Sequence, residues 1–141
     1  MVRERIRHRD GESICTDASG NVYIIGVFGS PIISFGATSL VTSSINGIYD
    51  GYFVKYDSSG NVLWAKDVGG TGGDYGYGIS TYGNGNVYVT GGFTAPSITL
   101  GTNTLTNQGD FDIYAAAPPI PLHVGNAATA EATPRCQGRA L

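Results

Sequence analysis

Two aspartates that flank a single phenylalanine, Asp110 and Asp112, come nearest in type and spacing to an active site. A pair of carboxyl groups can supply the acid and the nucleophile of a glycoside hydrolase. Asp50, however, holds the place of Asp112 in an earlier copy of the same sequence. Recurrence favours a structural role in which each aspartate begins a strand and caps a turn. We expect no catalytic residue here, and a glycan-active enzyme stays an alternative.

Other chemistry-bearing side chains are few. The two histidines, His8 and His123, lie outside the repeated part of the chain, so a Ser-His-Asp arrangement is hard to build. Cys15 and Cys136 are the only cysteines, and they form neither a disulfide framework nor a spaced zinc-ligand set. We therefore predict no enzyme and no catalytic, cofactor-binding or metal-binding residues.

A recurring motif, D-x-S-G-N, begins at Asp17 and again at Asp57 and lies between strand-like runs. An Asp, a Ser and an Asn so close together suggest calcium, but one carboxylate per loop is too few for a good site. The motif instead predicts a hairpin turn in which the aspartate accepts hydrogen bonds from the turn amides. Gly20, Gly60 and, in a related copy, Gly85 would supply a positive φ.

Two further features favour structure over ligand binding. The glycine-rich segment 69–78 lacks the Lys-Ser/Thr ending of a phosphate-binding loop and joins two strand runs, so we expect a linker. Trp64 could be a platform for a sugar ring, but a lone tryptophan between Leu63 and Ala65 in a strand is more typical of a core.

Charge divides the chain by region. Residues 11–114 hold eight acidic and two basic side chains, which argues against a nucleic-acid partner. Residues 1–10 form an arginine-rich start that we interpret as a solvated basic arm. No apolar run is long enough for membrane insertion, and the start lacks the apolar core of a signal peptide.

Self-similarity at a spacing of 65 residues dominates the middle of the sequence. The second copy matches the first without a gap over two segments and then, after a loss of three residues, over a third. The matched pairs are 13–28 with 78–93, 31–40 with 96–105, and 47–53 with 109–115. Such a period is the mark of a repeat architecture.

The strands of each copy are apolar on both faces. Val22 and Ile24 alternate with Tyr23 and Ile25, so neither face of that strand can meet water and the sheets must stack. A radial stack of antiparallel four-stranded sheets, the β-propeller blade, satisfies this requirement; a parallel β-helix has shorter rungs and needs no hairpins. The prediction is an all-β fold.

The unit boundaries follow from the repeat. Residues 11–75 form one complete blade and 76–116 an incomplete second blade, so no ring closes. Residues 117–141 abandon the pattern for an alanine- and proline-rich tail that reads as disordered or frame-shifted. We expect terminal faces and edges to expose apolar side chains, among them Tyr52, Val54, Val87 and Val89.

Three stretches carry a resemblance to a known family. They are "DYGYGISTYGNGNVYVTGGF", "ISFGATSL" and "YDGYFVKYDSSGNVLWAKDVGGTGGD", and within residues 11–114 they resemble the SBBP repeats, a bacterial β-propeller repeat family. The resemblance implies a blade of a many-bladed secreted or cell-surface protein. It brings no catalytic residues to transfer.

The favoured function is a non-enzymatic fragment of a bacterial extracellular β-propeller repeat protein, acting as a scaffold or binding module. The alternatives are a truncated or frame-shifted product without independent activity, and part of a glycan-active propeller enzyme. Expected partners are neighbouring blades of the same or a longer chain, with a protein or glycan ligand and self-association left open.

Overall fold

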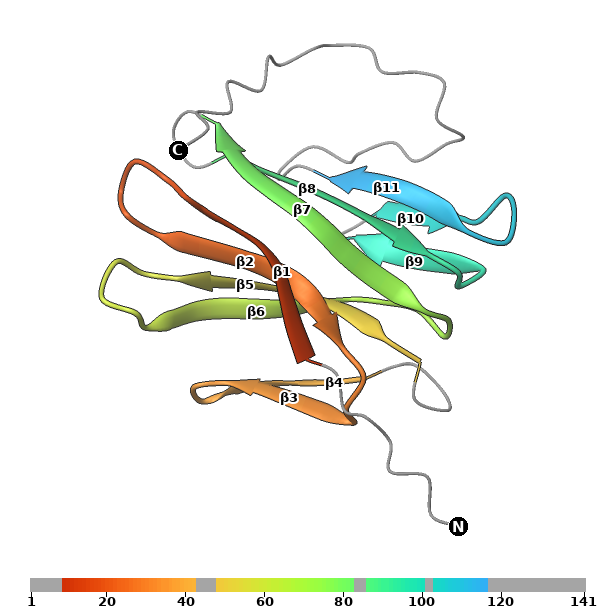
Figure 1. Ribbon diagram of the computed structural model, residues 1–141, viewed down its shortest axis with the longest axis horizontal. Helices are drawn as coiled ribbons and strands as arrows, with labels where there is room; N and C mark the ends of the chain where they lie inside the picture. Colours follow the sequence, from red (N-terminus) through yellow and green to blue (C-terminus); the bar gives the residue numbers. More distant parts are fainter. Residues whose placement is uncertain (1–8, 43–47, 83–85, 101–102, 117–141) are drawn as a thin grey trace.

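The computed structural model describes residues 9–42, 48–82, 86–100 and 103–116, and these ranges are all-β with antiparallel pairing throughout. They build two sheets and two small hairpins (Figure 1). His8, His123, Cys136, Gly85 and the tail 117–141 lie outside the described residues. Across the described ranges, no helix is long and apolar enough to cross a membrane.

Sheet 1 is a four-stranded antiparallel sheet, as the sequence predicts. Its strand order is β1-β2-β5-β6. The strands are β1 (Arg9–Thr16), β2 (Val22–Phe28), β5 (Asp50–Tyr56) and β6 (Val62–Val68). β1 begins at Arg9, so the last two residues of the range expected as a basic arm are part of this sheet.

Sheet 2 repeats the first three of these strands. Its order is β11-β8-β7, with β7 (Asp74–Tyr82), β8 (Asn86–Phe93) and β11 (Asp112–Ala116). The expectation that residues 69–78 form a linker is wrong for their second half, because β7 begins at Asp74 and only 69–73 connect the sheets. Among the described residues no strand takes the place of β6 in sheet 2, and the two sheets do not close a ring.

The D-x-S-G-N turns form as predicted. Asp17 Oδ1 accepts hydrogen bonds from the amides of Ser19 at 2.9 Å and Asn21 at 3.0 Å, and Asp57 repeats both bonds with Ser59 and Asn61. Gly20 has φ of 78° and Gly60 has φ of 87°, a region that other residues rarely adopt. These turns fix the register of the β1–β2 and β5–β6 hairpins.

Each repeat also contains a second, small hairpin, which the sequence pattern does not predict. β3 (Ile32–Phe35) pairs with β4 (Thr38–Val41), and β9 (Ser97–Leu100) pairs with β10 (Asn103–Thr106). The first of them turns through Gly36, whose φ is 58°. Figure 1 shows β3 and β4 on the opposite side of sheet 1 from sheet 2.

The expectation that Tyr52, Val54, Val87 and Val89 are exposed is wrong, because all four are buried. Ile33 and Leu40 of the β3–β4 hairpin pack with Tyr52 and Val54 and so cover part of the outer side of sheet 1. Val87 and Val89 lie instead on the side of sheet 2 that faces sheet 1. The inserted hairpin and the stacking therefore bury these four residues, while Ile14 on the outer side of sheet 1 stays 64% exposed.

Candidate functional site: the junction between the two sheets

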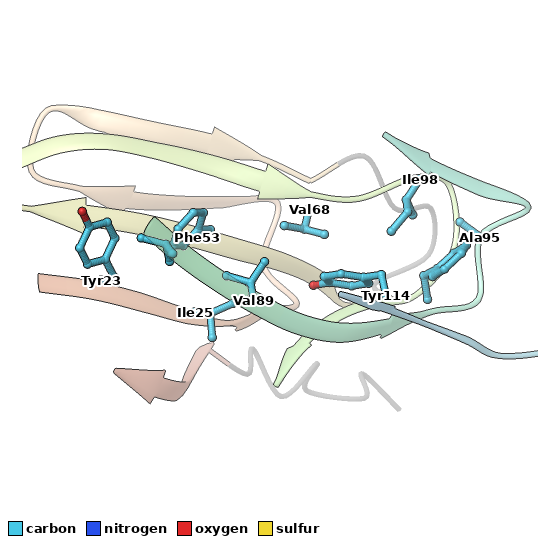
Figure 2. Close-up of a cluster of buried hydrophobic side chains, with 10 residues drawn as sticks. Tyr23, Ile25, Phe53, Val68, Val89, Ala95, Ile98 and Tyr114 are labelled. Atoms are coloured by element: carbon cyan, nitrogen blue, oxygen red, sulfur yellow. The ribbon is translucent and has the colours of Figure 1, made fainter. Parts of the chain in front are cut away.

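The largest buried cluster joins the two sheets through unlike faces. Sheet 1 contributes Tyr23, Ile25, Phe53 and Val68. Sheet 2 contributes Val87, Val89, Phe93 and Tyr114, which lie on the face opposite to the one that sheet 1 uses when the two repeats are aligned. Ala95 and Ile98, which follow β8, complete the cluster (Figure 2). We call this contact the junction. Each sheet thus has one junction face and one outer face.

Gly76 on β7 lies tightly against sheet 1. A Cβ on Gly76 would lie against Ile25 Cγ1 and only 2.8 Å from its Cδ1. Gly11 holds the same repeat position on the outer face of sheet 1, where a Cβ would meet Tyr52 Oη at 3.6 Å and Ile24 Cγ2 at 3.7 Å, both ordinary contacts. A glycine is therefore required at Gly76 in the junction, whereas Gly11 on the outer face has room for a larger residue.

Two polar contacts link the first strands of the sheets. The Ile79 amide donates to Ser13 Oγ at 3.3 Å, and Thr81 Oγ1 donates to the Thr16 carbonyl at 2.6 Å. Ile79 is half-buried against the junction core, whereas its repeat equivalent Ile14 is 64% exposed. The difference follows from position, because Ile14 lies on the outer face of sheet 1 and meets no further sheet.

Two buried carboxyl groups, Asp50 and Asp74, lie near each other at one end of the junction, and both are 0% exposed. The Asp74 amide donates to the Tyr49 carbonyl at 2.8 Å, and Asp74 Oδ2 accepts from the Gly70 amide at 2.6 Å. Asp74 Oδ1 is buried without a hydrogen-bond partner. A buried, unsatisfied carboxylate oxygen is costly.

Asp74 binds its proton unusually tightly. Burial raises its pKa from 3.8 to about 6, the hydrogen bond from Gly70 opposes that shift, and the charge of Asp50 adds to it. Protonation of Asp74 therefore removes a charge that is buried in the junction close to Asp50. Asp74 is a functional residue that the motifs of the sequence do not mark, although extending the 65-residue alignment upstream pairs it with Arg9.

Asp50 and Asp112, the aspartates considered for glycan cleavage, begin β5 and β11 at equivalent places in different sheets. Both are buried. Asp50 Oδ2 accepts from Thr42 Oγ1 at 2.7 Å, and Asp112 Oδ2 accepts from the Gln108 amide at 2.6 Å. Asp110 is exposed in the preceding turn. The structural role expected for Asp50 and Asp112 fits these bonds.

The turn aspartates are occupied by their own loops. Asp17 Oδ2 accepts from Asn21 Nδ2 at 2.8 Å and Tyr23 Oη at 2.9 Å. These bonds, first the one from the Asn21 side chain, lower the pKa of Asp17, and Asn61 does the same for Asp57. Among the described residues there is no group of three or more His, Cys, Asp or Glu side chains that could hold a metal ion.

Trp64 and Cys15 both belong to the packing. Trp64 is half-buried, with its ring 4.6 Å from that of Phe53 and 6.4 Å from that of Tyr23, which fits the core role predicted for it. Cys15 is a free, half-buried thiol against the junction core. Burial raises its pKa to about 11, with a smaller contribution from Asp17.

Comparison with known proteins gives one distant relative. The chain is 33% identical over 90 residues to an uncharacterized WD repeat-containing protein of Acanthamoeba polyphaga mimivirus, a match that covers 60% of this chain. The chain spans 6% of the length of that protein. No family model matches the sequence. The relative and the stacked antiparallel sheets are consistent with a propeller-type repeat.

Proposed function

We propose that this chain is a WD-repeat-like, propeller-type module whose role is to stack with further blades of the same kind in a non-enzymatic scaffold. In this role sheet 1 and sheet 2 are successive blades. The scaffold belongs to a longer assembly, which the resemblance to SBBP repeats would place outside the cell or on its surface.

The observation that carries the proposal is the pairing of unlike faces at the junction. A contact between a junction face and the opposite repeat face of the next sheet can be repeated along a chain, as stacked repeats require. The outer face of sheet 1 keeps the apolar residues that sheet 2 uses in the junction. Ile14, Ile24 and Phe28 stand where sheet 2 has Ile79, Val89 and Phe93.

The geometry of the carboxyl groups supports a role without catalysis. Asp50 and Asp74 are the closest approach to an acid pair at the junction, and both are fully buried, so a substrate could not reach them. Asp17, Asp57 and Asp112 each accept a hydrogen bond from an amide of their own turn. Recurrence at equivalent places in both sheets fits structure better than a single active site.

Lengthened chains test the stacking role. Copies of residues 9–73 would be inserted directly before Arg9, so that Gly73 of the added copy precedes Arg9 as it precedes Asp74 in the natural chain. We expect the first added copy to raise the Tm by about 5 °C and the chain to melt as one unit, since each new junction stabilises both neighbours. Differential scanning calorimetry measures the Tm and the number of transitions, and sedimentation checks that the lengthened chain is a monomer.

Two results would contradict the proposal. Added copies that melt in a separate transition, with the Tm of the natural chain unchanged, would show that the sheets do not stack further. Release of reducing sugars from polysaccharides by the natural chain, lost in Asp112→Asn, would favour the glycan-active alternative.

A further inference from the structure

The outer face of sheet 1 differs from its repeat counterpart in one charge. Arg9 begins β1 at the place where Asp74 begins β7, as the matching registers against Phe28 and Phe93 show. Arg9 Nε donates to Ser30 Oγ at 3.0 Å, and its Nη2 donates to the Ile32 carbonyl at 3.2 Å. These two bonds hold the exposed guanidinium at the end of the outer face.

The neighbour of Arg9 also differs between the two repeats. Ser30 is 1% exposed, and its hydroxyl accepts from Arg9 while donating to the Ile32 carbonyl at 2.8 Å. In sheet 2 the equivalent of Ser30 is Ala95, which offers no such bond and is fully buried in the junction. The two repeats thus place different residue pairs at the same two positions. Sheet 1 has Arg9 beside Ser30, and sheet 2 has Asp74 and Ala95.

The natural junction shows what a residue at this position meets. Asp74 lies beside the start of β5, with its amide bonded to the Tyr49 carbonyl and its carboxyl close enough to Asp50 for that charge to matter. A Cβ on Gly51 would first meet Val68 of the same sheet, with the carbonyl oxygen at 3.2 Å, and would then lie in ordinary contact with the Gly76 amide nitrogen at 3.4 Å, so a longer side chain after Asp50 would reach the neighbouring sheet. A residue at the place of Arg9 would therefore face an Asp-Gly pair.

We propose that the outer face of sheet 1 is a docking surface for a further sheet of the sheet 1 type, and that Arg9 selects a partner with a carboxylate at the start of its third strand. The inference rests on the proposed stacking function. An arginine beside that carboxylate forms an attractive pair where the natural junction has two carboxyl groups. Because the equivalent Asp74 is fully buried in the natural junction, the pair formed by Arg9 would be buried as well, and replacing one partner of a buried charge pair is costly.

A second copy of this chain does not present the required face. The junction face of its sheet 1 is already covered, and the outer face of its sheet 2 carries Thr90, Ala115 and Ile113 where sheet 1 has Ile25, Phe53 and Gly51. Thr90 is exposed and Ile113 is 51% exposed. The polar and small side chains remove core contacts, and Ile113 blocks the close approach that Gly51 allows.

The chain lengthened by one copy of residues 9–73 tests this assignment within one molecule. It has two Arg9 positions, one at the new junction and one on the free outer face. Arg9→Asp at the new junction recreates the like-charge pair and should lower the Tm by about 5 °C more than Arg9→Asp on the free face, which only loses the bonds to Ser30 and Ile32. Gly11→Ala provides a steric counterpart, costly at the new junction and mild on the free face.

The outcomes separate the two proposals. If the lengthened chain is no more stable than the natural chain, the stacking function fails. If it is more stable but Arg9→Asp lowers the Tm equally at both positions, stacking stands and the role of Arg9 is refuted. A natural chain that dimerises in sedimentation equilibrium, with the dimer lost in Arg9→Asp, would also overturn the inference, because a second copy would then be the occupant.

Discussion

Sheet 1 and sheet 2 come from copies of one sequence, yet their outer faces have diverged in opposite directions. The outer face of sheet 1 keeps Ile14 and Ile24 and ends in Arg9, whereas that of sheet 2 has replaced Ile25 and Phe53 of the first copy with Thr90 and Ala115. The outer face of sheet 1 thus keeps apolar residues of the kind that form the junction in sheet 2, whereas sheet 2 lacks the counterparts of Ile25 and Phe53. Under the proposed stacking, the outer face of sheet 1 suits a further sheet better than that of sheet 2 does.

The same comparison holds at single positions. Gly11 and Gly76 occupy one repeat position, and only Gly76 has a neighbouring sheet pressed against it. Ile14 and Ile79 form a second such pair. Because sequence and backbone are matched in each pair, a difference in the effect of the same substitution reports the junction itself.

The largest expected effect comes from Gly76→Ala. Its Cβ would overlap Ile25, which is fully buried, so we expect a loss of about 3 kcal/mol in the free energy of unfolding by urea. Gly11→Ala is the matched control and should change stability by less than about 1 kcal/mol, since its Cβ meets only ordinary contacts. Equal losses for the two variants would show that the sheets do not press together at Gly76.

Asp74→Asn should have the next largest effect, and it should depend on pH. The folded-state pKa of Asp74 is about 6 and its ordinary value is 3.8, so the folded chain binds the proton more tightly than the unfolded chain. Stability from this group is therefore full below about pH 4, falls as the pH rises to about 6, and stays low above it. Asparagine keeps an acceptor for the Gly70 amide and carries no charge.

At pH 7.5 we expect Asp74→Asn to unfold with a free energy about 1–3 kcal/mol above that of the natural chain, and at pH 4 with nearly the same value. Urea unfolding at both pH values measures this. Asp67→Asn, at an exposed aspartate of β6, serves as the control for a general change in net charge. A gain from Asp74→Asn that is the same at both pH values would contradict the raised pKa of the buried Asp74 carboxyl group.

A smaller effect is expected at the turns, which both copies share. Gly60→Val should cost about 1–2 kcal/mol, because φ of 87° strains a β-branched residue although nothing lies within 4 Å of the new Cβ. Gly109 also has open space around its Cβ and lacks a positive φ, so Gly109→Val should be nearly neutral in urea unfolding. Comparable losses in the free energy of unfolding for both variants would show that the positive φ of Gly60 is not the cause of the destabilisation.

The sequence predicted the architecture because the relevant signals are local. Alternating apolar residues such as Tyr23 and Ile25 required burial on both faces, and the D-x-S-G-N motif marked the turns at Gly20 and Gly60. The β3–β4 hairpin escaped notice because its strands have only four residues each. Without this hairpin the repeat pattern predicts exposed Tyr52 and Val54, which the hairpin in fact covers.

The candidate site could be predicted only in part. Asp50 was recognised as a recurring residue at a strand start, and the structure puts it there. Asp74 was not singled out, since its burial and its nearness to Asp50 depend on how the second sheet lies against the first. Contacts between repeats follow from docking geometry, which neither the strand period nor the turn chemistry encodes.

The reactivity of Cys15 tests most directly whether sheet 2 covers the junction face of sheet 1. In a chain with Cys136→Ser, Cys15 is the only thiol, and its native pKa of about 11 is two units above the ordinary 9.0. We predict that iodoacetamide at pH 8 alkylates the native thiol about 100-fold more slowly than the thiol of the urea-unfolded chain, because far less thiolate is present. Gly76→Ala should restore much of the rate. Equal rates in the native and unfolded chains would contradict a covered junction.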